Sequence, residues 1–103
     1  MIIVEGWVRL DRQHIEALRE AAAEMMRATK AAEPGCLEYA FAQDLAEPGL
    51  LRVIERWADE AALAAHFATP HMAAFNQSLG DAKILGASIK VYAGTEVRTI
   101  MAL

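Results

Sequence analysis

The sequence predicts an α+β fold in which four strands and two helical regions follow the order βαββαβ. Three observations lead to this fold class. Residues 2–10, 36–43 and 50–57 show the period-two alternation of strands, residues 11–32 repeat apolar side chains at helical spacing, and Pro-Gly pairs separate the middle elements. A chain of 103 residues accommodates one such unit, so we expect a single domain over 1–103.

The first strand is predicted from Ile2 to Leu10. Its core-facing residues are Val4, Val8 and Leu10. Asp11 ends the strand and is a favoured N-cap residue, and the apolar positions after it recur at helical spacing. These positions are Ile15, Leu18, Ala22, Met25, Met26 and Thr29. We therefore expect an amphipathic helix from Asp11 to about Ala32.

The segment Glu33-Pro34-Gly35 ends this helix. Proline disfavours the helical conformation at the residue before it, and we expect Gly35 to turn the chain back through a positive φ angle. The next strand, Cys36 to Gln43, is predicted to place Leu37, Tyr39 and Phe41 on one face. A Glu47-Pro48-Gly49 turn then leads into Leu50 to Trp57, which predicts an antiparallel hairpin.

The second helical region is predicted to be interrupted. Asp59 fits an N-cap for a helix that presents Leu63, His66 and Phe67 together. Thr69-Pro70 indicates a second start, followed by the inward-facing residues Met72, Phe75 and Leu79. From Gly80 to Gly86 we expect a connection without regular secondary structure. Ser88 to Ala93 supplies the last strand, and Thr95 to Ile100 is expected either to extend the sheet or to reach a partner chain.

This order of elements is the ferredoxin-like split arrangement, with the helices on one face of an antiparallel sheet. The other face would be bare, although the strands carry apolar residues on both faces. Hydrophobic residues make up 55% of the chain and the mean hydropathy is +0.18, which is more apolar than is usual for a soluble monomer. We therefore expect a homodimer in which a second copy covers the bare face.

Charge and composition argue against several classes of protein. The net charge is −4 and the ten Lys and Arg residues are scattered, so nucleic acid is not expected as a partner. Cys36 is the single cysteine and cannot form an internal disulfide. The sequence shows neither a leader pattern at Met1 nor an apolar run long enough for a bilayer. We expect a cytoplasmic protein that does not act at a membrane.

The sequence also lacks the common metal and cofactor motifs. It has no His-x-x-x-His pair, no cysteine pair, no HExxH and no glycine-rich strand-to-helix loop for phosphates. Cys36 has no neighbouring base in sequence, so a small buried thiol is favoured over a nucleophile. We expect no metal and no cofactor.

The stretch from Glu33 to Phe75 carries the strongest functional pattern. It contains, in order, a Pro-Gly-Cys turn, Tyr39, a strand that ends in Glu55-Arg56-Trp57, His66, Thr69-Pro70-His71 and Phe75. In this order and joint spacing the chain resembles the antibiotic biosynthesis monooxygenase family. The resemblance implies a dimeric α+β barrel and the cofactor-independent oxidation by O2 of quinols, anthrones or similar electron-rich aromatics.

His66 and Glu55 are the candidate catalytic residues. Imidazole titrates near neutral pH, and the helix position of His66 borders an apolar face, so His66 is suited to proton transfer. The alternative is a boundary histidine bonded to a backbone group. Glu55 is expected either to orient His66 or to hold a substrate hydroxyl, because a carboxylate on a half-buried strand must be paired or protonated. Its alternative is a salt bridge with Arg52, Arg56 or a partner chain.

An aromatic wall is predicted around these two residues. Its members are Tyr39, Trp57, Phe67 and Phe75, which suit a polycyclic phenol but which at such spacings are more often plain core. His71 is expected at the mouth of the pocket and His14 in solvent. The haem-degrading branch of the family places a Trp where this chain has His66 and a His where it has Asn76, so the departure argues against haem and leaves Asn76 as a substrate-binding candidate.

The functional prediction is a monooxygenase that acts on a small aromatic substrate and O2 without a cofactor. A second class of protein remains open, in which the same pocket binds or isomerises an aromatic metabolite without oxidation. Oxygen uptake distinguishes the two.

Overall fold

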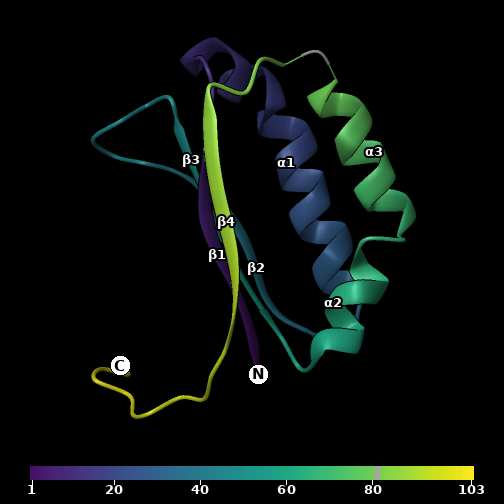
Figure 1. Ribbon diagram of the computed structural model, residues 1–103, viewed down its shortest axis with the longest axis vertical. Coiled ribbons are helices and arrows are strands. Elements are labelled where there is room, and N and C mark those ends of the chain that lie inside the picture. The colour runs from purple at the N-terminus through teal and green to yellow at the C-terminus, as the bar shows by residue number, and fades with distance from the viewer. Residues whose placement is uncertain (81) are drawn as a thin grey trace.

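The structure is a computed structural model that describes residues 1–80 and 82–103 of the chain. Over these residues it has four strands and three helices. They are β1 (Ile2–Arg9), α1 (Arg12–Ala32), β2 (Cys36–Gln43), β3 (Leu50–Trp57), α2 (Glu60–His66), α3 (Pro70–Leu79) and β4 (Gly86–Ala93). Figure 1 shows all the labelled helices on one side of the sheet, which confirms the predicted α+β class and the ferredoxin-like order. Asp81, in the stretch expected to lack regular secondary structure, lies outside the described residues.

The sheet is antiparallel throughout, with the strand order β2-β3-β1-β4. The register places one residue from each strand in a row across the face that the helices cover, and that row is Tyr39, Glu55, Val4 and Val91. Glu55 therefore stands on a central strand, between an aromatic and an aliphatic neighbour. Glu55 is the one charged residue on the helix side of β3, where the other positions are Leu51, Val53 and Trp57.

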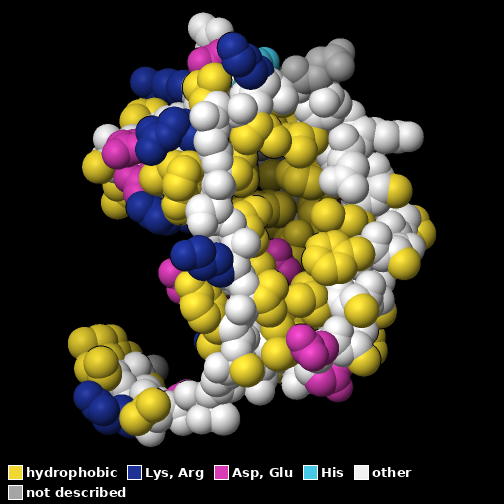
Figure 2. All heavy atoms as spheres, in the orientation of Figure 1, with side chains coloured by type: hydrophobic (Ala, Val, Ile, Leu, Met, Phe, Trp, Pro, Cys, Tyr) yellow, Lys and Arg dark blue, Asp and Glu magenta, His cyan; other side chains and the backbone are white. Residues whose placement is uncertain are grey.

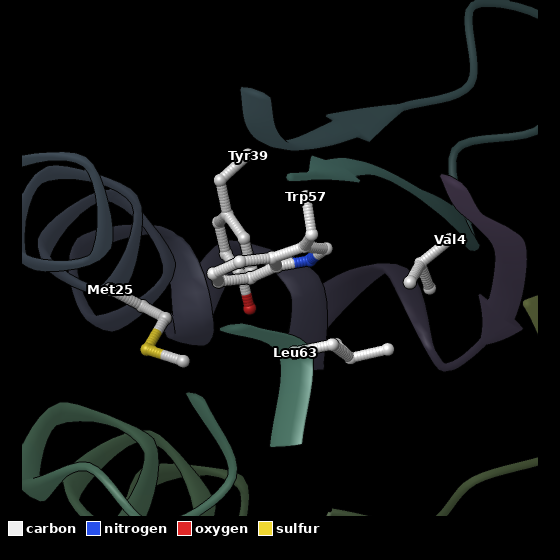
Figure 3. Packing of buried hydrophobic residues seen from close by; sticks show 5 residues of the cluster. All are labelled: Val4, Met25, Tyr39, Trp57 and Leu63. Atoms are coloured by element: carbon white, nitrogen blue, oxygen red, sulfur yellow. The ribbon is translucent and has the colours of Figure 1, made fainter. Parts of the chain in front are cut away.

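The core forms where α1 packs against β2 and α3, and where α2 packs against β3. Figure 3 shows the side chains of its central cluster, Val4, Met25, Tyr39, Trp57 and Leu63, converging from five different elements. Each fully buried side chain of this size contributes about 1.5–3 kcal/mol through removal of apolar surface from water. The cluster fixes the distance between α2 and the sheet.

The two caps predicted for the second helical region are both present. The side chain of Asp59 accepts a hydrogen bond from the backbone N–H of Ala62 at 2.8 Å, and that of Thr69 accepts one from Met72 at 3.2 Å. Asp11 is also at the N-cap position of its helix, but its side chain makes no capping bond among the described residues.

Two local predictions in the second strand and its turn are wrong. The β2–β3 pairing shifts register between Cys36 and Glu38, so Leu37 is exposed while Cys36 packs against the core. Gly35 has no positive φ; among the described residues only Gly80 does. What Gly35 provides is space, because a Cβ there would lie 2.5 Å from the Cβ of Ala62 on α2.

The helices leave the sheet open along β4. Ile89 and Val91 lie on the helix side, opposite Gly6 and Val4 of β1, yet both are half-exposed. Figure 2 shows the resulting hollow beside the front strand, lined mostly by hydrophobic side chains. The open edge gives a ligand a way to the interior of the fold.

The C-terminal residues 94–103 form neither helix nor strand, and Figure 1 shows them leaving the end of β4 away from the sheet. The prediction that Thr95 to Ile100 extends the sheet is therefore wrong, while a reach toward a partner stays a prediction. Val97, Ile100 and Met101 are exposed on this segment. No helix in the described part of the chain is both long and apolar enough to span a bilayer.

Candidate functional site

An apolar cavity of about 450 Å³ lies between the sheet and the two short helices. This volume is within the usual range for sites that bind small molecules. Most of its lining is aliphatic or aromatic, and the polar exceptions are Tyr39, Glu55, His66 and Asn76. The first three come together at one end, since Tyr39 pairs with Glu55 across β2 and β3 and its ring centre is 5.1 Å from that of His66. The cavity thus combines an apolar body with a polar end.

His66 is the last residue of α2, and only 1% of its surface is exposed. Its ring lies 4.8 Å from that of Trp57 and forms part of the cavity wall. Its Nδ1 is 2.8 Å from Oε2 of Glu33, so the partner is a carboxylate and the alternative of a backbone partner for the ring is wrong. The hydrogen-bond partner of the His66 ring among the described residues is therefore Glu33, whereas Glu55 bonds to Trp57.

Glu33 reaches His66 because of the turn that follows α1. Its backbone N–H donates to the carbonyl of Thr29 as the helix ends. The carbonyl of Gly35 accepts from the N–H of Ala58 at 2.9 Å, which fixes the turn against the residue that follows β3. The sequence predicts Glu33 only as the residue at which the first helix ends. Its position directly before Pro-Gly was the one available signal that its side chain projects from a rigid turn.

His71 is not among the residues that line the cavity, and its ring centre is 6.1 Å from that of His66, so its place at the pocket mouth stays a prediction. Its Nε2 is 2.6 Å from the same Oε2 of Glu33. Thr69 sets the spacing of the two histidines: its hydroxyl donates to the carbonyl of His66 at 2.8 Å and accepts from the N–H of Met72. The corner between α2 and α3 therefore directs both imidazoles to one carboxylate.

Glu55 is buried on the cavity floor and accepts a hydrogen bond from Nε1 of Trp57 at 2.9 Å. The predicted alternative of a salt bridge within the chain is wrong for the residues described, since Arg52 pairs with Asp44 and Arg56 approaches Glu38. Burial raises the pKa of the Glu55 carboxyl, against the lowering effects of the Trp57 N–H and of His66. Glu55 thus places a carboxyl group in the lining of a mostly apolar cavity.

The predicted aromatic wall is only partly present. Trp57 has 0% exposed surface and belongs to the core behind the cavity, so its assignment to the wall is wrong. Tyr39 lines the cavity, and burial together with the nearby carboxylates Glu55 and Glu33 raises the pKa of its hydroxyl. Tyr39 therefore stays a neutral phenol and can donate a hydrogen bond.

The remaining wall comes from phenylalanines. Phe67 is exposed at the rim, and Phe75 lies inside beside Phe41, with ring centres 5.3 Å apart and nearly parallel planes. The same pair also lines a second cavity of about 180 Å³ toward α1, so the stacked rings separate the two spaces. Asn76 lines the main cavity from α3. His14 is a part-exposed residue of α1 near Asp11 and takes no part in this site.

Glu33, His66 and His71 also form a cluster of potential metal ligands among the described residues, with one ligand atom from each within 4.8 Å of the others. Common metal-binding sequence motifs have ligands close together in the chain, whereas Glu33 is 33 positions from His66 and 38 positions from His71. The expectation of a metal-free protein stays a prediction.

Two solved structures are similar to the whole fold. A protein from Deinococcus radiodurans that is named after the antibiotic biosynthesis monooxygenases shares 28% identity and a TM-score of 0.84, covering 99% of this chain and 100% of its own. PA3566 from Pseudomonas aeruginosa shares 27% identity and a TM-score of 0.77, covering 92% of this chain and 94% of its own.

A curated relative and a family match complete the comparison. Protein sll1783 of Synechocystis, whose function is uncharacterized, is 37% identical over 68 residues, which is 66% of this chain. The matched part covers 46% of that relative, so this chain corresponds to about half of its length. Residues 1–78 match the family described as antibiotic biosynthesis monooxygenase, and they include Tyr39, Glu55, His66 and Phe75. The chain belongs to the antibiotic biosynthesis monooxygenase family.

Proposed function

We propose that this protein is a cofactor-independent monooxygenase that oxidises a quinol, an anthrone or a similar electron-rich aromatic with O2. The observation that carries the proposal is a buried imidazole, His66, in the wall of a mostly apolar cavity and oriented on its far side by Glu33. Membership of the monooxygenase family supports the reaction type. The apolar body of the cavity favours a flat aromatic substrate, and the polar end favours one with hydroxyl groups.

The proposed first step is removal of a proton from a phenol or enol hydroxyl by Nε2 of His66. The O–H bond breaks, an N–H bond forms, and the electron pair stays on the substrate as a delocalised anion. In its carboxylic acid form, which burial favours by raising the pKa of the group, Glu55 would donate a hydrogen bond to this anion. Tyr39 offers a second donor at the same end.

In the proposed second step the anion gives one electron to O2, and the substrate radical and superoxide combine to form a C–O bond. The peroxide takes back the proton from Nε2 of His66 and then loses water to leave a carbonyl. For an anthrone the net change is CH2 + O2 → C=O + H2O, so the substrate supplies all the electrons. An apolar cavity favours recombination of the radical pair over escape of superoxide.

Oxygen consumption is the direct test. Purified, chelator-treated protein is expected to consume O2 with at least one member of a panel of quinols and anthrones, at a rate proportional to protein concentration and unchanged by further chelator. An oxygen electrode measures the rate, and visible absorbance and elemental analysis measure flavin, haem and metal. Binding of these aromatics without O2 uptake would instead support the non-oxidative alternative, a binding protein or isomerase.

We further propose a homodimer built on the sheet face opposite the helices. Ile54 on β3 and Tyr92 on β4 lie on that face at 46% and 48% exposure. Exposed apolar side chains on the bare face of a sheet are typical of a face that a partner covers. The exposed C-terminal segment, residues 94–103, would then be free to reach the second copy.

The dimer proposal predicts a mass of twice the chain at micromolar concentration, measured by light scattering. Replacing Ile54 with Asp is expected to shift the protein to monomers, since it places a charge in the proposed interface. Leu45→Asp is the matched control, because Leu45 is fully exposed in the β2–β3 connection. A monomeric wild type, or equal behaviour of the two variants, would contradict this interface.

A further inference from the structure

We propose that Glu33 and His71 are positioning residues for His66: one carboxylate oxygen shared by two imidazoles holds His66 in the tautomer whose Nε2 is free to accept a proton in the cavity. The inference rests on the proposed role of His66 as the base, and it adds two residues to the site. Neither is needed to explain the cavity itself. His71 is not among the residues that line it, and Glu33 lies behind the His66 ring.

The geometry centres on one atom. Oε2 of Glu33 is 2.8 Å from Nδ1 of His66 and 2.6 Å from Nε2 of His71. An ionised carboxylate only accepts hydrogen bonds, so each of these nitrogens carries a hydrogen. In a neutral His66 ring with hydrogen on Nδ1, the basic lone pair is on Nε2. Glu33 thereby selects the tautomer that suits the proposed first step.

Burial strengthens this selection. The side chains of Glu33 and His71 are 10% and 15% exposed, and that of His66 is 1% exposed. A hydrogen bond to a charged group is stronger than one between neutral groups, so it outweighs the small intrinsic difference between imidazole tautomers. When Nε2 of His66 takes a proton, the positive ring remains beside the Glu33 carboxylate. The other ionisable groups around this cluster are Glu55 and Tyr39 at the cavity end, and Cys36 near Glu33.

His71 has a distinct part in this arrangement. A single bond from His66 would leave the Glu33 side chain able to rotate about its own axis, whereas a second donor from another helix fixes the oxygen in place. The Thr69 hydroxyl ties the end of α2 to the start of α3, so the two donors keep a constant separation. His71 is therefore expected to act through Glu33, without contact with the substrate.

A bound metal is the competing interpretation of the same three side chains. Around a tetrahedral zinc with bonds of about 2.0–2.1 Å, ligand atoms lie roughly 3.3 Å apart. Both nitrogens here lie nearer to one carboxylate oxygen than that, at 2.8 Å and 2.6 Å. Hydrogen bonds account for such spacings directly. We therefore favour the hydrogen-bonded arrangement and include the metal in the test.

The test uses ¹⁵N-labelled full-length protein and long-range ¹H–¹⁵N NMR of the imidazoles, which reports tautomers without any substrate. Wild-type His66 is expected to carry its hydrogen on Nδ1, and His71 on Nε2. In Glu33→Gln the His66 ring is expected to become a mixture of tautomers while the amide spectrum shows an intact fold. Glu24→Gln removes an exposed carboxylate of α1 that pairs with Arg27 and is expected to change neither ring.

Activity supplies the second measurement. Glu33→Gln is expected to lower kcat by about 10- to 100-fold with little change in KM. Loss of a carboxylate that orients a metal-bound histidine has an effect of this size in metalloenzymes. His71→Leu should lower kcat in the same way, and His71→Gln, whose amide can still donate to Glu33, should restore most of it. A purely structural role would not produce rescue by the amide together with a tautomer change.

Three results would overturn the inference. One is hydrogen on Nε2 of wild-type His66, and another is a His66 tautomer that Glu33→Gln leaves unchanged. The third is retention of one equivalent of Zn²⁺ after purification, with both imidazole ¹⁵N signals moved by its removal, which would make the cluster a metal site. If no substrate is found, the proposed function fails while the NMR experiment still decides the roles of Glu33 and His71.

Discussion

Replacing His66 with asparagine is expected to lower turnover of a quinol or anthrone by about 10²-fold or more, the usual effect of losing a positioned general base. Asparagine is the informative substitution because its amide nitrogen lies near the place of Nδ1 and can still donate to Glu33. The shorter asparagine side chain then leaves no basic nitrogen at the position that Nε2 of His66 occupies. Initial rates of O2 uptake measure the effect, and thermal unfolding verifies that the variant is folded.

Alanine is less suitable at position 66 than asparagine. It would leave a buried carboxylate without one donor and open a cavity between the rings of Tyr39 and Trp57, so activity and stability would fall together. Phe75→Ala is a useful comparison, since it should raise KM through lost aromatic surface. Wild-type turnover by His66→Asn across the pH range would contradict the proposed base and make Glu55 the next candidate.

The second large effect is expected at Trp57. Trp57→Ala should lower the free energy of unfolding by about 3–5 kcal/mol, because it removes a fully buried indole and leaves Glu55 without its hydrogen-bond donor. For a domain of this size the loss corresponds to a fall in Tm of at least about 10 °C. Circular dichroism during heating and urea titration measures both quantities.

Two further variants separate the contributions of Trp57. Trp57→Phe keeps an aromatic ring but loses the N–H, so it should lower the free energy of unfolding by about 1–3 kcal/mol. The same substitution should have a smaller effect in a Glu55→Leu background, where the carboxylate that accepts the N–H is absent. Phe67→Ala, on the exposed rim, should change stability by less than about 0.5 kcal/mol. If Trp57→Ala were as stable as the wild type but bound substrate more weakly, Trp57 would belong to the cavity wall and not to the core.

Much of the fold follows from local patterns. Period-two alternation located the four strands, and the pattern of Ile15, Leu18 and Met25 located the buried stripe of α1. Asp59 and Thr69 were recognisable as caps because a short polar side chain before a helix has one main use. Such signals are readable because the interactions that they encode join residues only a few positions apart.

Structural details that depend on contacts between different elements were harder to predict from the sequence. Leu37 looked core-facing because alternation was assumed to continue through the strand, and one register shift beside Cys36 reversed its side. Gly35 was predicted to adopt a positive φ angle. Glycine is required there for a different reason, because Ala62 of α2, later in the chain, leaves no room for a Cβ. Neither fact has a local signature.

Four residues that line the cavity, His66, Glu55, Tyr39 and Phe75, were predicted to do so from residue type and order, while their roles stay a prediction. The partner of His66 was not predicted. Glu33 stands 33 positions from His66 and 38 from His71, and their meeting depends on how the turn after α1 docks against the corner between α2 and α3. Periodicity carries no information over such separations. Trp57 was assigned to the cavity wall although it is fully buried in the core behind the wall. A strand pattern gives the face on which a side chain lies but not the depth at which a neighbouring element covers it.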